Sequence, residues 1–228
     1  ELGSLDAVQA VLEKQGLRVS VLELLHAWSG GDVAAIDEEL AVVQHFAAVL
    51  DPEVVLAAAL VPALHANAAA ALRAHCQALA PRKVALEFLP FTGVANLAAA
   101  LALREQVDEP NLGLVIDSWH FARAGFEYEL LDQLPGEWIY FVQLNDAAVE
   151  PWADPFAETM GGRLRPGEGA VDWPRVMEIL EAKRLTCPIG TEQYSNVVKA
   201  MPLEEACRYL HDSVQAIVAD PHHRPVSD

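Results

Sequence analysis

Strand-like and helix-like segments alternate along this chain from one end to the other, and this alternation narrows the possible folds more than any other feature. Helical spacing and capping residues predict helices over residues 4–16, 32–50, 67–79, 96–107, 127–134, 173–183 and 202–218. Short apolar runs rich in Val, Leu and Ile predict strands over residues 17–25, 53–60, 83–89, 112–117, 138–144 and 188–192. Such alternation is typical of a parallel sheet whose strands are joined by crossover helices.

A closed barrel and an open doubly wound sheet are the two main forms of such a sheet. No strand is followed by a glycine-rich turn of the GxGxxG or P-loop kind. That absence weakens the nucleotide-binding, doubly wound alternative. The sequence therefore favours an α/β fold of the TIM (β/α)₈ barrel type in a single domain over residues 1–228.

The pattern contains fewer strands than a closed barrel of this type, which has eight. The chain also opens directly on a helix. We therefore expect that the first one or two strands of the barrel, with the helix between them, are missing from this sequence. The alternative is that two irregular strands lie within the chain and lack a clear pattern. The last residues, 220–228, are polar, and we expect a frayed tail there.

Charge and cysteine content exclude some kinds of partner and location. The net charge of −18 disfavours nucleic-acid binding, because such a surface repels phosphate backbones. The longest apolar stretch, residues 54–64, carries Pro62 and is about half the roughly 20 residues of a membrane span. The 3 cysteines lack metal-site spacing, and no signal peptide is visible. We expect a reduced, cytoplasmic protein with no membrane partner.

Polar side chains stand at the carboxyl ends of four otherwise apolar strands. They are Glu87, Asp117, Gln143 and Glu192. In barrels the carboxyl ends of the strands form the active-site face, so these side chains should converge. Three carboxylates would repel one another there unless a divalent cation neutralised them. We therefore predict a single metal site built from these four residues.

Each of these residues also has a simpler interpretation. A single acidic residue at a strand end is more often a helix cap or a salt-bridge partner. His120, three residues after Asp117, would by itself be a hydrogen-bonded packing residue. The repetition at equivalent positions of four strands favours the metal site over these interpretations.

Several short motifs resemble a known family. They are Leu-Glu-Phe around Glu87, Asp-Ser-Trp-His from Asp117, Gln-Leu-Asn-Asp from Gln143, Arg-Leu-Arg-Pro-Gly-Glu-Gly from Arg163, and Thr-Glu ending at Glu192. Their order and spacing resemble those of the sugar phosphate isomerase/epimerase family, also called xylose-isomerase-like or endonuclease-IV-like barrels. The resemblance runs from about Leu17 onward and is specific for the superfamily, but it is weak for the substrate.

The resemblance implies roles for particular residues. Glu87, Asp117 and Glu192 match the family's metal carboxylates, His120 matches a histidine that contacts substrate, and Arg163 matches an arginine that holds a substrate oxygen. Gln143 stands where most members have a metal-binding histidine, and in this it resembles the 3-dehydroshikimate dehydratases. An all-oxygen ligand set favours Mn²⁺ or Mg²⁺ over Zn²⁺. Family resemblance also implies a possible homo-oligomer.

Residues 147–165 show no periodicity and carry the pair Gly161-Gly162. Long loops inside compact domains are usually functional, so we expect an active-site loop that could close over a substrate with the glycines as a hinge. The alternative is a loosely packed insertion.

The expected site supports proton transfer next to a carbonyl group. A metal that binds a carbonyl and a neighbouring hydroxyl stabilises an enediolate, while Glu87 and Glu192 could remove and return a proton. Return to the adjacent carbon gives isomerisation, return to the other face gives epimerisation, and loss of a hydroxyl gives dehydration. The first hypothesis is an isomerase or epimerase of a small polyhydroxy carbonyl compound, a sugar or cyclitol.

Three other functions remain open. A lyase acting on 3-dehydroshikimate or an inosose is the second hypothesis, and Gln143 favours it. An abasic-site nuclease needs a histidine-rich cluster of three metals, whereas Gly161 and Arg163 occupy the matching loop positions and the charge is wrong for DNA. A non-catalytic binding barrel is the last alternative.

Overall fold

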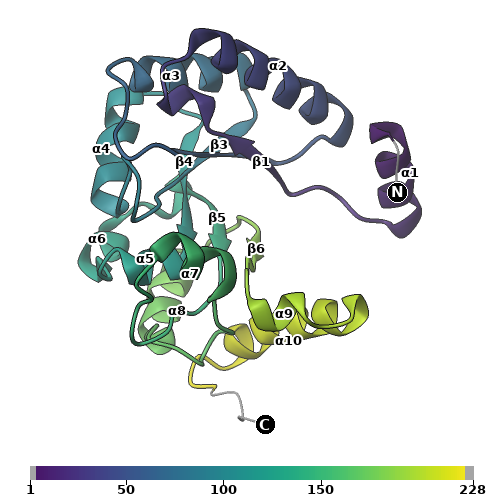
Figure 1. The fold of residues 1–228 in the computed structure, drawn as a ribbon, viewed down its shortest axis with the longest axis vertical. Helices are drawn as coiled ribbons and strands as arrows, with labels where there is room; N and C mark the ends of the chain where they lie inside the picture. Colours follow the sequence, from purple (N-terminus) through teal and green to yellow (C-terminus); the bar gives the residue numbers. More distant parts are fainter. Residues whose placement is uncertain (1–3, 224–228) are drawn as a thin grey trace.

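The computed structural model describes residues 4–223, and within them the chain alternates between strands and helices (Figure 1). One sheet of 6 parallel strands runs through the molecule. Its strands are β1 (Val21–Leu25), β2 (Val54–Ala58), β3 (Lys83–Glu87), β4 (Leu112–Asp117), β5 (Ile139–Gln143) and β6 (Ile189–Gly190). Each predicted strand is present; β4 has the expected bounds, and the other strands are shorter than expected.

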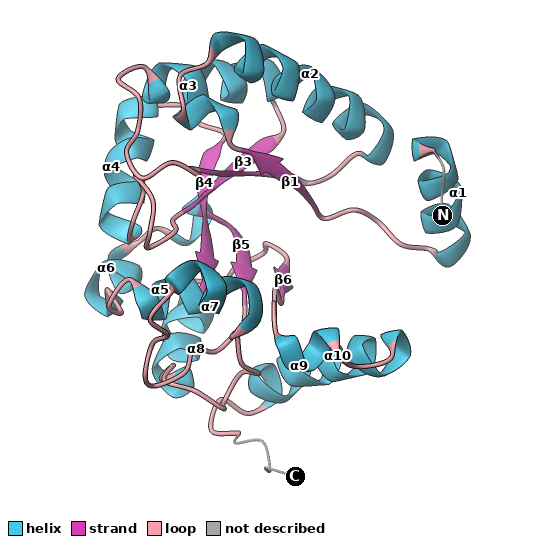
Figure 2. Cartoon of the chain, in the orientation of Figure 1, coloured by secondary structure: helices cyan, strands magenta, loops and turns pink. Residues whose placement is uncertain are grey.

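Helices connect the strands and lie outside the sheet (Figure 2). They are α1 (Leu5–Gln15), α2 (Val33–Leu50), α3 (Ala68–Leu79), α4 (Leu97–Val107), α5 (Ser118–Arg123), α6 (Tyr128–Gln133), α7 (Pro155–Gly161), α8 (Trp173–Ala182), α9 (Asn196–Lys199) and α10 (Leu203–Ala219), with single 3₁₀ turns at Ala27–Ser29 and Gly136–Trp138. The predicted helices are all found. The short helices α5, α7 and α9 were not predicted, because so few residues give no clear period.

The capping residues define the helix ends as the sequence predicts. The Ser4 side chain accepts a hydrogen bond from Ala7 N at the start of α1, and Gly16 ends that helix in the left-handed conformation. Asp32 caps α2 in the same way through Ala34 N and Ala35 N. These local signals therefore set where each connection begins.

The strand order is β1-β2-β3-β4-β5-β6, and every neighbouring pair is parallel. Sequential neighbours without a reversal of order are the topology of a (β/α) barrel, whereas a doubly wound sheet reverses at a switch point. Within residues 4–223 the sheet has no further strand, so the alternative of two overlooked strands is wrong. The absence of the family's first strands from this sequence stays a prediction.

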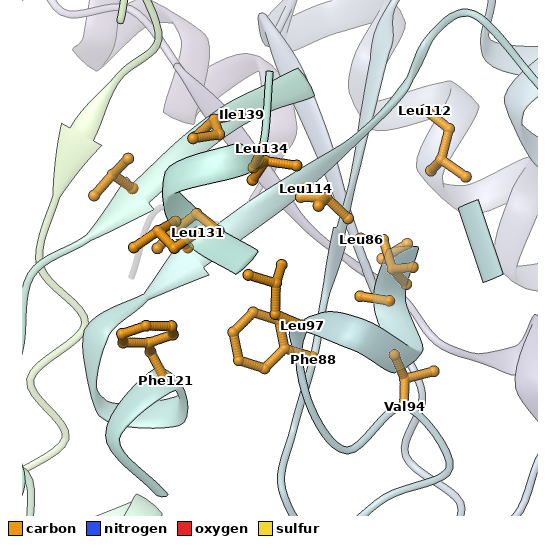
Figure 3. Packing of buried hydrophobic residues seen from close by; sticks show 14 of the residues in the cluster. Leu86, Phe88, Val94, Leu97, Leu112, Leu114, Phe121, Leu131, Leu134 and Ile139 are labelled. Carbon is orange, nitrogen blue, oxygen red and sulfur yellow. The ribbon is translucent and has the colours of Figure 1, made fainter. Parts of the chain in front are cut away.

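The core lies on both faces of the sheet. One large cluster fills the space between strands and helices and includes Leu86, Leu114 and Leu97 (Figure 3). A smaller cluster lies on the opposite face and includes Ala85, Val115 and other strand residues. Because side chains alternate along a strand, residues two positions apart share a face. The last residues of β3, β4 and β5 therefore fall on the face of the smaller cluster, inside the barrel curve.

Candidate metal centre

Glu87, Asp117 and Gln143 are the last residues of three consecutive strands. Parallel pairing sets Ala58 opposite Glu87 and Asp117 opposite Gln143, which brings the strand ends to one edge of the sheet. Glu192 follows two residues after the end of β6, whose Gly190 pairs with Gln143. The sheet thus places all four residues of the predicted ligand set on one side.

Four side chains approach closely at this edge. Glu87, Asp117, His120 and Glu192 each offer one ligand atom, and these atoms lie within 4.8 Å of one another. Glu87, Asp117 and His120 are buried, with 7%, 1% and 1% of their surface exposed, so water cannot screen their charges. A cluster of this size and composition can surround one divalent cation.

Several polar atoms at this edge are buried without a hydrogen-bond partner in the protein. Among residues 4–223, Glu87 Oε1, Gln143 Oε1 and His120 Nδ1 make no hydrogen bond, and Gln143 is only 2% exposed. Buried acceptors are rarely left unpaired in folded proteins, since each one costs about 1–3 kcal/mol. The two oxygens are hard donors, so the orphaned atoms fit a divalent metal ion.

Arg163 enters the centre from the loop that precedes α8. Its Nη1 donates to Asp117 Oδ2 and Glu192 Oε2, at 3.0 Å in each case. Its Nη2 lies 3.3 Å from His120 Nε2 and donates to Thr159 Oγ1 at 2.9 Å. The predicted substrate-binding arginine is therefore engaged with the acidic side chains of the centre itself.

Asp117 also acts as a helix cap, as the simpler interpretation proposed. Its Oδ1 accepts from His120 N at 2.9 Å, at the first turn of α5. Its other oxygen, Oδ2, accepts from both Arg163 and Asn145. The two interpretations are thus compatible, because one carboxylate oxygen caps the helix and the other faces the centre.

Burial and mutual repulsion shift the protonation of the carboxylates. Burial raises the pKa of Glu87 well above its usual range, and the charges of Glu192 and Asp117 raise it further. Burial raises the pKa of Glu192 to about 7 against the opposing charge of Arg163. Burial raises the pKa of Asp117 as well, although Arg163 lowers it. Excess negative charge in this centre therefore calls for more positive charge than one arginine supplies.

The nitrogen bases of the centre respond to the same environment. Burial and the Arg163 charge lower the pKa of His120 well below its usual range, so its imidazole is neutral at neutral pH. Burial by itself would lower the pKa of Arg163, but the charges of Asp117, Glu192 and Glu87 raise it. A neutral imidazole can accept a hydrogen bond or bind a metal ion.

Two residues of the centre were not assigned a role from the sequence. Asn145 is fully buried and donates to Asp117 Oδ2 at 2.7 Å, while its Oδ1 accepts from Glu192 N at 2.9 Å. Glu23 in β1 is exposed overall, yet partial desolvation raises the pKa of its carboxyl, and its charge raises that of Glu192. Asn145 follows Gln143 by two residues on the same face, which is the signal that could have revealed it.

Asp146 organises the loop that carries Arg163. Its carboxylate accepts from the backbone N–H groups of Gly167 and Val171 and from Trp173 Nε1, at 2.9, 3.0 and 2.9 Å. A Cβ atom on Gly169 would lie 2.4 Å from Asp146 Oδ1 and 2.2 Å from a backbone oxygen. The glycine that ends the Arg-x-x-Pro-Gly-x-Gly motif is therefore required by close packing against Asp146.

Residues 147–165 are not irregular throughout, because they contain α7. A buried ion pair between Glu158 of α7 and Arg123 of α5 attaches this segment to the barrel. A Cβ atom added to Gly161 would lie 2.9 Å from the Asn196 side chain, and one added to Gly162 would lie 2.8 Å from the Trp152 side chain. Gly161 therefore lies close to α9 and Gly162 close to another part of the same segment, and the closing motion expected of the segment stays a prediction.

The sheet is curved and parallel, and acidic side chains gather at the carboxyl ends of its strands. These features define an α/β-barrel protein with a candidate divalent-metal centre. The chain belongs to the xylose isomerase-like TIM barrel family, whose model matches residues 2–213. No helix of the described residues is both long and apolar enough to cross a bilayer.

Curated relatives are enzymes of related chemistry. The inosose isomerase of Halalkalibacterium halodurans is 28% identical over 139 residues, which are 60% of this chain and 48% of that protein. The 3-dehydroshikimate dehydratase of Pseudomonas aeruginosa is 30% identical over 105 residues, 44% of this chain and 16% of that protein. The chain thus aligns with about half the length of the inosose isomerases it matches and with a smaller part of the dehydratase.

Solved structures confirm the fold. The structure of the IOLI protein with a zinc atom superposes with a TM-score of 0.83 and 23% sequence identity, covering 95% of this chain and 82% of that one. At this identity the likeness shows a shared architecture and nothing finer.

Proposed function

We propose that this protein is a divalent-metal-dependent isomerase or epimerase of a small polyhydroxy carbonyl compound, a sugar or a cyclitol. The observation that carries the proposal is the cluster of four ligand atoms within 4.8 Å of one another. The orphaned Oε1 atoms of Glu87 and Gln143 at the same strand ends support it, because a metal ion would give them a partner.

Glu87, Asp117, Gln143 and Glu192 are the residues that would hold the ion. When bound, a divalent ion supplies positive charge that stabilises negative charge developing on neighbouring carbonyl and hydroxyl oxygens of the substrate. That effect acidifies the adjacent C–H group. His120 and Arg163 lie beside the ligand set and could orient the substrate oxygens through hydrogen bonds.

The two glutamates are suited to move the proton. Glu87 ends β3 and Glu192 follows β6, with β4 and β5 between them, so their carboxylates approach the centre from separate strands. Burial raises the pKa of Glu192 to about 7 in the centre without an ion, so its carboxylate is a stronger base than an exposed glutamate. One glutamate would remove the proton and the other would return it.

The relatives support the choice of reaction. Inosose isomerases of Halalkalibacterium halodurans and Bacillus subtilis match the same share of the chain, 60% each. Isomerisation of a cyclic polyhydroxy ketone needs no chemistry beyond the proton transfer described above. We therefore favour a cyclitol or sugar substrate of this kind.

The donor set suggests the metal. Three carboxylates and the amide oxygen of Gln143 are hard ligands, which favour Mn²⁺ or Mg²⁺ over Zn²⁺. The zinc in the IOLI structure belongs to that protein. Replacing Gln143 by His should shift the preference of this chain toward Zn²⁺, because imidazole is the softer donor.

A metal-dependent dehydratase is the second candidate. Gln143 favours it by its resemblance to the 3-dehydroshikimate dehydratases, and the Pseudomonas aeruginosa enzyme matches the chain at 30% identity. The proton removal is shared by both reactions. They differ in whether a hydroxyl group leaves afterwards.

Metal content and proton exchange together test the proposal. Protein purified without chelators is analysed by mass spectrometry for metals, and then incubated with an inosose, ketoses and 3-dehydroshikimate in heavy water under NMR. We expect bound metal, deuterium incorporation next to the carbonyl, and a new isomer. Bound metal and deuterium incorporation should both be lost in a Glu192→Gln variant. An aromatic, ultraviolet-absorbing product would identify the dehydratase, and absence of metal even after soaking would reject both enzymes.

We also propose a cytoplasmic location, a possible homo-oligomer, and no nucleic-acid or membrane partner. All three cysteines are free thiols, which fits a reducing compartment. The net charge of −18 disfavours polyanionic partners. Light scattering would give the oligomeric state directly.

A further inference from the structure

Arg163 is buried, and every donor of its guanidinium group is used inside the protein. The residue is 3% exposed. Nε donates to Thr159 O at 3.0 Å and Nη2 to Thr159 Oγ1 at 2.9 Å. Nη2 also lies 3.3 Å from His120 Nε2, while Nη1 donates to Asp117 Oδ2, Glu192 Oε2 and the backbone oxygen of Glu192 at 3.0 Å each. A guanidinium has five N–H groups, so this arrangement satisfies the whole fork.

The carboxylate oxygens that Arg163 holds are ones that a metal ion would need. Asp117 Oδ1 is committed to the N–H of His120. Asp117 Oδ2 accepts from Arg163 Nη1 and from Asn145 Nδ2, at 3.0 and 2.7 Å. A carboxylate oxygen offers about two lone-pair positions, and both are occupied here. A cation can therefore bind Asp117 Oδ2 only if one of these two donors withdraws.

Arg163 is the donor that would withdraw. Asn145 is neutral and is held at its other end by Glu192 N and Thr191 Oγ1, so its release would break further bonds. Arg163 carries a positive charge, which repels an incoming cation. A neutral donor can remain beside a metal ion, whereas a guanidinium in contact with the same oxygen competes with it.

We propose that Arg163 is the resident counter-cation of this acidic centre, that it gives up Asp117 and Glu192 to an incoming divalent ion, and that it thereby sets the affinity of the centre for metal. The inference rests on the proposed function, since it takes the four-residue centre to be a metal site. It assigns Arg163 a role in the metal-free protein, before any substrate is bound.

The surroundings of Arg163 allow it to change partners without leaving the protein. Its two bonds to Thr159 of α7 do not involve the carboxylates. The rings of Trp119 and Tyr194 lie 5.3 and 5.5 Å from its guanidinium carbon and stabilise a cation at that position. A small rotation of the guanidinium group can therefore free the two carboxylate oxygens while Thr159 and the two aromatic rings still contact the charge.

Calorimetric titration with Mn²⁺ alone tests this role, with Arg163→Gln compared against Arg165→Gln. The Arg165→Gln substitution removes an equal charge from the same loop, but Arg165 pairs with Glu168 and does not contact the centre. We expect Arg163→Gln to lower the metal-free melting temperature and to bind Mn²⁺ at least about tenfold more tightly than the unmodified protein. Arg165→Gln should bind like the unmodified protein.

Each result separates the inference from the proposed function. If the unmodified protein binds Mn²⁺ and Arg163→Gln binds it equally or more weakly, Arg163 is not a competitor and this inference is overturned. If neither the unmodified protein nor either variant binds a divalent ion, the proposed function fails together with the inference. Tighter binding in Arg163→Gln alone supports it.

A second measurement does not depend on the glutamine variant folding. In protein labelled with ¹⁵N-arginine, the Arg163 guanidinium resonances are identified by their absence from Arg163→Lys. Addition of Mg²⁺ should shift these resonances, because Nη1 loses its carboxylate partners. Resonances that stay in place while Mg²⁺ binds would overturn the proposal.

Discussion

The buried side chain of Asn145 shows how single residues control this centre. It contacts two of the predicted metal ligands at once, the carboxylate of Asp117 through Oδ2 and the backbone of Glu192 through its N–H. Residues that orient ligands in this way affect metal affinity without touching the ion. Asn145 is therefore a positioning residue.

Replacing Asn145 by Ala should weaken Mn²⁺ binding by about 10–100-fold and destabilise the protein by about 1–3 kcal/mol, because Glu192 N and Thr191 Oγ1 lose their acceptor and Asp117 Oδ2 loses one of its two donors. Calorimetric titration and urea unfolding measure the two effects. Asn67→Ala is the matched control, because Asn67 is exposed and makes no side-chain capping bond. Equal effects in both variants would contradict the positioning role.

The raised pKa of Glu192 also makes a prediction about pH. A carboxyl whose pKa is about 7 in the folded protein and near 4.5 when unfolded binds its proton more tightly in the folded state. Its stabilising contribution is therefore present below the unfolded pKa and is lost as pH rises through about 7. In chelator, the free energy of unfolding should fall between about pH 5 and about pH 8.

Urea unfolding of Glu192→Gln provides the comparison, because glutamine does not titrate. The pH dependence of unfolding should be flatter in this variant than in the unmodified protein. A decrease of the same size in both proteins would show that Glu192 is not its source.

At the scale of single elements, short segments decide how the centre is presented. Helix α5 begins at the residue after Asp117, and α7 supplies the Thr159 partner of Arg163. The loop after α7 then turns around Asp146, against which Gly169 packs closely. These segments have too few residues to show a helical period, yet they hold Arg163 and His120 in place.

Gly169→Ala should disturb this loop, because the added methyl group would overlap Asp146 and a backbone oxygen. We expect a loss of about 1–3 kcal/mol in stability and weaker metal binding, both measured as above. Gly30→Ala is the control, since a Cβ there meets no atom closer than 3.9 Å and the backbone is right-handed. Unchanged stability and metal binding in Gly169→Ala would mean that the loop does not depend on this contact.

On the scale of the whole molecule, a metal ion that binds only the folded chain should stabilise all of it. The proposed ligands come from β3, β4, β5 and the segment after β6, so one ion would link four parts of the sheet. Stability should rise by about 2.7 kcal/mol when free Mn²⁺ is 100 times its dissociation constant.

Thermal unfolding with increasing Mn²⁺ measures this effect, and Glu87→Gln is the comparison. The melting temperature of the unmodified protein should rise steadily with metal, whereas that of the variant should rise less. A melting temperature that does not respond to Mn²⁺ in the unmodified protein would argue against a metal site that includes these strands.

Much of the fold could be predicted from local signals. Caps such as Ser4 and Asp32 act on residues two or three positions away, and apolar runs determine strands by their own composition. The polar residues at the strand ends, Glu87 and Asp117 among them, stand out for the same reason. Parallel pairing then required them to meet at one edge.

The sequence by itself therefore determined the alternating elements, the family and several of the residues that meet at the centre, Glu87, Asp117, His120 and Glu192 among them. Only the tertiary structure decided how those residues are paired. Arg163 reaches Asp117 across 46 positions and Asn145 reaches it across 28. The Asn145 contact follows from the pairing of β4 with β5. The Arg163 contact depends on how the loop after α7 folds back over the sheet, and no local pattern encodes that path. The charge balance of the centre follows from those long-range contacts, because Arg163 pairs there with Asp117 and Glu192, which are distant in the sequence.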